Sequence, residues 1–69
     1  MKKITIKFYE CEHTEDLNKY ENDIRDSGGT IFISSVDSDE EIGTVLFEVE
    51  NEDDFWTKFS KTDAYGFIN

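Results

Sequence analysis

The residues with the most reactive side chains stand together at Cys11-Glu12-His13. A thiolate beside an imidazole suits nucleophilic catalysis, and both groups are common zinc ligands. The chain has one cysteine and one histidine, so no further thiol or imidazole completes a zinc site. Glu10 and Glu12 place negative charge beside the thiol, which raises the pKa of a cysteine and disfavours its thiolate form. We therefore interpret this tripeptide as a turn between two elements.

An acidic run at Asp37-Ser38-Asp39-Glu40-Glu41, followed by Glu48, resembles a calcium-binding loop in its spacing of carboxylates. Such a loop requires glycine at its sixth position, where this chain has Ile42, and it joins two helices, whereas both neighbouring segments here have strand patterns. We expect a solvated acidic hairpin, with weak divalent-cation binding as the alternative. We assign no metal ligand.

No other group of residues forms a catalytic or cofactor signature. With 17 acidic residues, a neighbouring pair of carboxylates carries no specificity as a general acid and base. Gly28-Gly29 lacks the spacing of a phosphate-binding loop and follows a predicted helix, so its amides are not at a helix N-terminus. We expect a protein that is not an enzyme, with no catalytic residues and no cofactor.

The first half of the chain predicts a strand followed by a helix. Residues 3 to 10 alternate, with the apolar positions on one side, as in a half-buried strand. Thr14 has the chemistry of an N-cap, and apolar residues then recur at helical spacing up to Gly28-Gly29, which can adopt the left-handed conformation that ends a helix. The inward residues are Ile4, Ile6 and Phe8 in the strand and Leu17, Tyr20 and Ile24 in the helix.

The second half predicts a hairpin followed by another helix. Residues 30 to 36 alternate as a strand, with Ile31 and Ile33 on one face, and Phe32, Ser34 and Val36 on the other. Residues 42 to 50 form the next strand, with Val45, Phe47 and Val49 inward. Asn51 is the expected cap of a second helix that carries Phe55, Trp56 and Phe59 and ends near Gly66. Phe67 and Ile68 remain as a tail or a short fourth strand.

The order β-α-β-β-α predicts one α+β domain over residues 1–69, a two-layer sandwich with an antiparallel or mixed sheet. A right-handed crossover with the third strand between the first two gives the sheet order 1-3-2 and places both helices on one face. This topology resembles a ferredoxin-like sandwich whose last strand is absent or vestigial. The resemblance implies no activity, because that fold hosts many unrelated functions.

The face of the sheet opposite the helices is predicted to be too apolar for comfortable solvation. It would carry Thr5, Tyr9, Phe32, Val36, Thr44 and Leu46, of which Tyr9, Phe32, Val36 and Leu46 are candidate contacts. Three interpretations stay open: scattered exposed side chains, a homodimer through this face, or a different partner.

The charge pattern is the clearest functional signal in the sequence. Seven basic and 17 acidic residues give a net charge of −10, and between Glu10 and Thr57 the only bases are Lys19 and Arg25. Such a surface repels nucleic acid and anionic membranes and attracts basic proteins. One cysteine excludes an intrachain disulfide, and no apolar run has the length of a membrane span, so we expect a cytoplasmic protein.

Carboxylates at alternate strand positions lie about 6.6 Å apart, a spacing of the order of that between neighbouring phosphates. The chain resembles, as a class, the nucleic-acid-mimicking inhibitors of phages and mobile elements. This resemblance implies occlusion of the basic site of a nuclease, CRISPR effector, glycosylase or polymerase, in the host cytoplasm if a phage encodes the chain. The candidate contact residues are Glu15, Asp16, Asp23, Asp39, Glu40, Glu41, Glu48, Glu50, Asp53 and Asp54. The alternative is a small homodimeric ferredoxin-like interaction or regulatory module that uses the open sheet face.

Overall fold

The structure, a computed structural model, describes all 69 residues as an α+β domain. Its strands are β1 (Lys2–Phe8), β2 (Thr30–Asp37) and β3 (Ile42–Val49), and its helices are α1 (Asn18–Asp26) and α2 (Glu52–Phe59). Two 3₁₀ turns, η1 (Thr14–Leu17) and η2 (Asp63–Phe67), precede α1 and follow α2. The predicted order of strands and helices is confirmed. Neither helix has the length and apolar character needed to cross a membrane.

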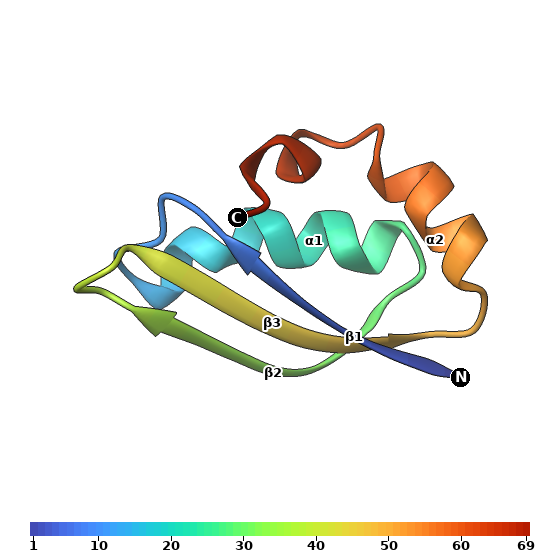
Figure 1. The fold of residues 1–69 in the computed structure, drawn as a ribbon, viewed down its shortest axis with the longest axis horizontal. Coiled ribbons are helices and arrows are strands. Elements are labelled where there is room, and N and C mark those ends of the chain that lie inside the picture. Colours follow the sequence, from blue (N-terminus) through green and yellow to red (C-terminus); the bar gives the residue numbers. More distant parts are fainter.

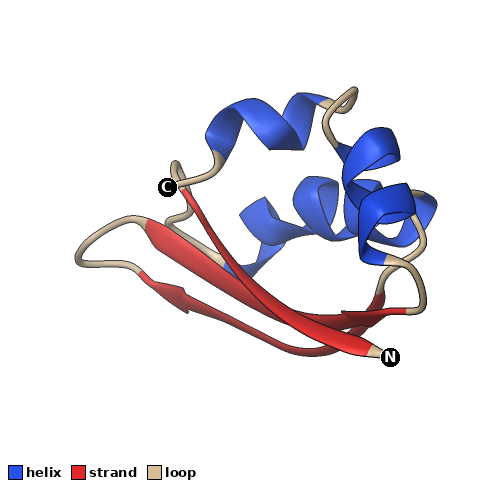
Figure 2. Cartoon of the chain, turned by 45° about the vertical axis from the view of Figure 1, so that its right-hand side comes forward, coloured by secondary structure: helices blue, strands red, loops and turns tan.

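The sheet has the predicted order β1-β3-β2, and both pairings are antiparallel. Both helices lie on one side of it, which gives two layers (Figures 1 and 2). Alternation explains this arrangement, because one face of each strand is apolar and has to be covered. The core between the layers consists of Ile6, Phe8, Cys11, Leu17, Tyr20, Ile24, Val45, Phe47, Val49, Phe55, Phe59 and Ala64. The inward residues predicted for the first and third strands therefore lie in the core or, like Ile4, pack against it.

The first helix is shorter than the sequence predicts. Thr14 is the first residue of η1 and not an N-cap, and α1 has nine residues. The Asp16 carboxylate accepts hydrogen bonds from the backbone N–H groups of Glu12 and His13, at 2.9 and 3.0 Å, so the first turn tightens around this side chain. The predicted stop is confirmed, since Gly28 has φ of +107° just after α1.

The second helix begins as predicted and ends earlier. Asn51 Oδ1 accepts a hydrogen bond from the Asp54 N–H at 3.0 Å, which confirms the cap. The helix ends at Phe59 and not near Gly66. The Thr62 hydroxyl donates to the Phe59 carbonyl at 2.7 Å, and the Thr62 N–H donates to the same oxygen at 3.0 Å. Because this carbonyl is already occupied, the chain leaves the helix and forms η2.

A β-bulge at Phe32 corrects the predicted faces of β2. Ile31 pairs with Phe47 and Ile33 pairs with Leu46, so Phe32 is an extra residue in β2. Beyond the bulge the alternation is inverted. Simple alternation placed Val36 on the open face, and this prediction is wrong, because Val36 packs against the core. Ile33, in contrast, is 61% exposed.

The end of the chain lies beside β1. Phe8 and Ile68 form an isolated antiparallel bridge, flanked by hydrogen bonds of 2.8 Å from the Asn69 N–H to the Lys7 carbonyl and from the Tyr9 N–H to the Phe67 carbonyl. The short fourth strand that the sequence left open is thus reduced to one bridge. The rest of this edge of β1 has no strand partner.

Candidate functional site

The candidate acidic contacts lie in three separate regions of the fold. Asp39, Glu40 and Glu41 belong to the β2–β3 turn, and Glu15, Asp16 and Asp23 to η1 and α1. Glu48, Glu50, Asp53 and Asp54 run from the end of β3 into α2. The β2–β3 turn and α2 lie at opposite ends of the molecule, whose longest dimension is 33 Å (Figure 1). The fold therefore spreads the candidate acidic residues over three regions instead of collecting them on one face.

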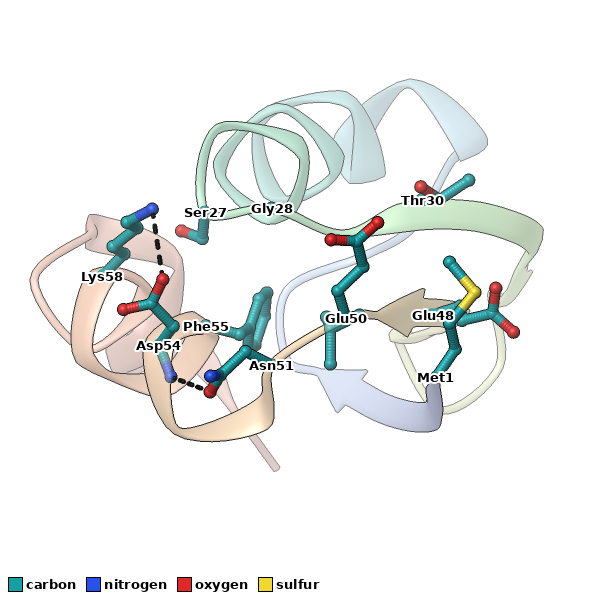
Figure 3. A pocket seen from close by; sticks show the side chains of 11 residues that line it. Met1, Ser27, Gly28, Thr30, Glu48, Glu50, Asn51, Asp54, Phe55 and Lys58 are labelled. Carbon is teal, nitrogen blue, oxygen red and sulfur yellow. Dashed lines mark hydrogen bonds and ion pairs between the residues drawn. The ribbon is translucent and has the colours of Figure 1, made fainter.

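At the α2 end, Glu48, Glu50 and Asp54 line one pocket of about 280 Å³, which we call the acidic pocket. Its walls come from the turn between α1 and β2, the end of β3, the start of α2 and Met1 (Figure 3). Glu48 is half-buried, whereas Glu50 and Asp54 are exposed. Figure 3 shows the Glu48 and Glu50 side chains leaving the end of β3 in different directions.

Local backbone signals position these carboxylates. β3 ends at Val49, and Asn51 adopts an extended conformation while its side chain caps α2, which turns the chain sharply after Glu50. The cap places Asp54 at the third helical position, in the first turn, where the helix dipole favours a negative charge. Lys58 forms an ion pair with Asp54 at 3.8 Å across one turn of helix. The pocket thus holds three carboxylates and one ammonium group.

The lining of the acidic pocket has the charge and the acceptors that a cationic group requires. No group of three or more His, Cys, Asp or Glu side chains in the molecule is arranged to hold a metal ion. A guanidinium group has five donors in a planar fork and can address separate carboxylates, whereas a metal ion needs its ligands converged on one point. The geometry of this pocket is therefore closer to what a guanidinium group can use than to what a metal ion needs.

The opposite end holds a second acidic group, the hairpin end, made of Glu10, Glu12, Asp39, Glu40 and Glu41. The Cys11 N–H donates to the Glu41 carbonyl at 2.9 Å and ties the loop after β1 to the β2–β3 turn. A side-chain hydrogen bond with Glu12, together with the negative charges of Glu12 and Glu10, raises the pKa of Glu41. Glu10 and Glu41 both have left-handed backbones, with φ of 61° and 59°.

Sequence reasoning named Glu41 and missed Glu10 and Glu12 as its neighbours. Their proximity depends on a hydrogen bond between two segments that are distant in sequence, and no local pattern marks it. The sequence offered one indirect signal, which is the pair of glutamates on either side of an apolar Cys11.

Two of the candidate contacts stabilise the fold itself. Hydrogen bonds from the backbone N–H groups of His13 and Glu12 lower the pKa of Asp16. The Asp23 carboxylate accepts a hydrogen bond from the Ala64 N–H at 3.2 Å and joins α1 to η2. Glu15 in η1 is exposed. Of these three residues, Glu15 alone has a carboxylate with no hydrogen bond or ion pair inside the molecule.

The cysteine and histidine have different environments. Cys11 is fully buried, and its thiol donates to the Tyr9 carbonyl at 3.6 Å. Burial raises the pKa of Cys11, which favours the thiol. His13 is exposed at the start of η1. The Cys11 side chain is therefore a core group.

Of the candidate contacts on the open sheet face, two keep their place. Phe32 is 50% exposed, and Leu46 lies half-buried between Thr5 and Ile33 in the register of the sheet. Tyr9 lies just beyond the end of β1 and is half exposed, and its carbonyl accepts a hydrogen bond of 3.1 Å from the buried Tyr20 hydroxyl. Ile33, which the sequence placed on the inner face, joins Phe32 because of the bulge.

Comparisons with known proteins assign no relative to this arrangement: no protein-family model matches the chain, and neither the curated proteins nor the solved structures gave a match.

Proposed function

We propose that the protein is a non-enzymatic acidic binding protein that mimics nucleic acid and occludes the basic site of a nucleic-acid-processing protein. The observation that carries this proposal is the acidic pocket, which Glu48, Glu50 and Asp54 line together with Lys58. All three are among the contacts expected from the sequence. An arginine or lysine that normally binds a phosphate would enter this pocket and meet carboxylates in place of phosphate oxygens.

The distribution of charge supports a contact longer than the pocket. The hairpin end adds five acidic residues at the other end of a molecule 33 Å long, which is comparable with one turn of B-DNA, about 34 Å. A basic groove that follows a duplex would meet negative charge at both ends. Binding would draw on the counterion release and electrostatic steering that drive nucleic-acid association.

The chemistry of the surface sets the class of partner. A nuclease, CRISPR effector, glycosylase or polymerase has the basic groove that this surface requires, and an inhibitor of the phage or anti-CRISPR type is the corresponding biological role. The protein itself would bind neither nucleic acid nor membranes, because its charge of −10 repels both. We place the encounter in the cytoplasm, since the single cysteine is a free, buried thiol.

The test is capture followed by displacement. The immobilised protein is exposed to bacterial lysate at about 0.05 M salt and eluted with a step to about 0.5 M, which screens surface charges. Each eluted protein is then loaded with labelled nucleic acid, and the acidic protein is added. We expect a basic protein to elute and its nucleic acid to be displaced. Capture that resists the salt step, or nucleic acid that stays bound, would contradict the proposal.

A matched pair of variants locates the contact. Glu48→Gln, Glu50→Gln and Asp54→Asn together remove three charges from the acidic pocket, and Glu21→Gln, Asp26→Asn and Asp63→Asn remove three at residues that are not candidate contacts. We expect the first set to weaken binding by at least about tenfold more than the second, because a charge pair buried in the complex contributes more to affinity than long-range electrostatic attraction does. Equal losses would assign the binding to net charge and exclude the pocket.

The open sheet face supports a second candidate function, a homodimeric interaction or regulatory module. Phe32 and Ile33 have 50% and 61% of their surface exposed, and Ile33 lies opposite Leu46 in the register of the sheet. Neighbouring exposed apolar side chains favour association. In this proposal the fold is a ferredoxin-like sandwich, supported by the bridge between Phe8 and Ile68 at the position of a fourth strand.

A further inference from the structure

One edge of β1 has unpaired backbone groups. In an antiparallel strand, successive residues direct their N–H and C=O groups alternately to the two sides. The Lys7 carbonyl accepts from the Asn69 N–H on the side opposite β3, so the backbone groups of Thr5 and Lys3 point to the same side. No strand lies there beyond the bridge at Ile68. β1 therefore offers a row of donors and acceptors to an added strand.

An apolar groove of about 450 Å³ runs beside this edge. Ile4 and Ile6 of β1 line it on one side and Trp56 of α2 on the other, and Ile68 closes the end at the bridge. Ile4, Trp56 and Ile68 are partly buried and pack against the core, so the groove is continuous with the core. A strand added to the edge would direct every second side chain into this groove.

The other face of β1 carries unpaired positive charge. Lys3 and Lys7 are exposed and flank Thr5 on the outer face of the sheet. The ion pairs of the molecule are Arg25–Glu21 and Lys58–Asp54, so neither of these lysines forms an ion pair within the molecule. Side chains of an added strand that point away from the groove would lie beside these two ammonium groups.

We propose that the free edge of β1 binds an extended peptide in which apolar and acidic residues alternate. The peptide adds antiparallel to β1 and continues the line of Ile68 and Asn69, over about five residues opposite Ile6 to Lys2. Its apolar residues enter the groove opposite Ile6 and Ile4. Its acidic residues contact Lys3 and Lys7 on the outer face.

The strand already paired with β1 places one carboxylate beside the lysines of β1. Phe47 lies opposite Ile4, Glu48 opposite Lys3 and Val49 opposite Lys2. Thr44 lies opposite Lys7, so Lys3 alone has an acidic neighbour across this pair of strands. The net charge of −10 opposes an acidic ligand at long range, but at physiological ionic strength charges are screened beyond about 8 Å, so the nearby lysines dominate.

Two probe peptides test the proposal, acetyl-TVEVEVT-amide and acetyl-TVKVKVT-amide. Trp56 is the single tryptophan and lines the groove, so its fluorescence reports occupancy. We expect a saturable change with the glutamate peptide and at least about tenfold weaker binding of the lysine peptide. Hydrogen exchange should slow at the Thr5 and Lys3 amides. Equal affinities, or protection at the β2 edge instead, would overturn the proposal.

Two variants separate the edge from the charges. Thr5→Pro removes a donor that faces the free edge and makes no bond to β3, so it should reduce binding by at least about tenfold while β1 stays paired. Lys3→Glu with Lys7→Glu should reverse the preference between the peptides. Arg25→Glu with Lys61→Glu makes the same change of charge at residues that line neither the groove nor the acidic pocket, and it should leave the preference unchanged.

These outcomes are decisive even where one variant fails. If a thermal melt shows that Thr5→Pro is unfolded, the proposal is tested by the Lys3→Glu and Lys7→Glu variant alone, through the reversal of its preference between the two peptides. If the control pair reverses the preference as well, the effect is one of net charge and the proposed edge site is wrong. Failure of the peptide proposal does not decide the proposed function, because the acidic pocket has its own test in the variants at Glu48, Glu50 and Asp54.

Discussion

At the scale of single residues, Gly43 shows how closely the loop after β1 packs on the sheet. It lies buried on the inner face of β3. A Cβ atom at this position would lie 2.8 Å from Cys11 Sγ and 3.0 Å from Leu17 Cγ. Both neighbours are fully buried core side chains, so neither can move aside at low cost.

We expect Gly43→Ala to destabilise the protein by about 1–3 kcal/mol, because overpacking forces core side chains from their preferred positions. Chemical denaturation measures the change in the free energy of unfolding. Gly66→Ala is the matched control, since nothing lies within 4 Å of a Cβ there, and its effect should stay within about 0.5 kcal/mol. Equal effects of the two substitutions would contradict the close packing at Gly43.

Glu41 gives a prediction on pH. Its pKa is raised in the fold, chiefly by the hydrogen bond and charge of Glu12, so the folded state holds this proton more tightly than the unfolded chain. The contribution to stability is therefore greatest below the ordinary pKa of 4.5 and is lost as the pH rises through the raised value. Glu41→Gln should raise the melting temperature at about pH 7 relative to wild type. At about pH 4 the difference in melting temperature between the variant and wild type should be smaller.

Asp16→Asn is the control of opposite sign. The pKa of Asp16 is lowered by backbone hydrogen bonds, so its carboxylate stabilises the fold above the ordinary pKa of 3.8, and this stabilisation is lost as the pH falls through the lowered value. The substitution should lower the melting temperature at neutral pH. If Glu41→Gln also lowered it there, the glutamates of the hairpin end would not repel one another as the structure implies.

At the scale of elements, the bulge in β2 decides which side chains the open sheet face presents. Strand alternation predicted the inner faces of β1 and β3 because each has an uninterrupted period of two. In β2 the same rule failed beyond Phe32, since a bulge is set by the register against β3 and leaves no local mark in the sequence. The end of α2 was missed for a related reason, because the Thr62 hydroxyl competes for the Phe59 carbonyl before Gly66 is reached.

The homodimer belongs to this scale. If the open sheet face mediates it, sedimentation at about 100 μM should give a dimer, and Phe32→Asp or Ile33→Asp should give monomers, because a buried unpaired carboxylate is costly. Tyr65→Asp makes a similar change at a side chain that is 47% exposed elsewhere, and this variant should remain dimeric. A monomeric wild type under these conditions would exclude this function.

At the scale of the whole molecule, the net charge could be counted from the sequence, whereas the places of the charged side chains in the fold could not be predicted from it. The net charge is −10, but the positions of the carboxylates depend on where the chain turns after β3 and between β2 and β3. Glu48, Glu50 and Asp54 line the same pocket because Asn51 turns the chain after β3, and the cap at Asn51 was predicted from the sequence. The meeting of Glu12 with Glu41 depends on tertiary contact alone.

The position of β1 has a consequence for the order in which the chain folds. Its strand partner is β3. The paired residues are 35 positions apart at Phe8 and Gly43 and 47 positions apart at Lys2 and Val49. Closing so long a loop costs more entropy than closing the β2–β3 turn, so the hairpin should form first and β1 should dock last. During synthesis β1 emerges before any partner exists. Its three lysines then repel the same segment of neighbouring nascent chains until β3 arrives.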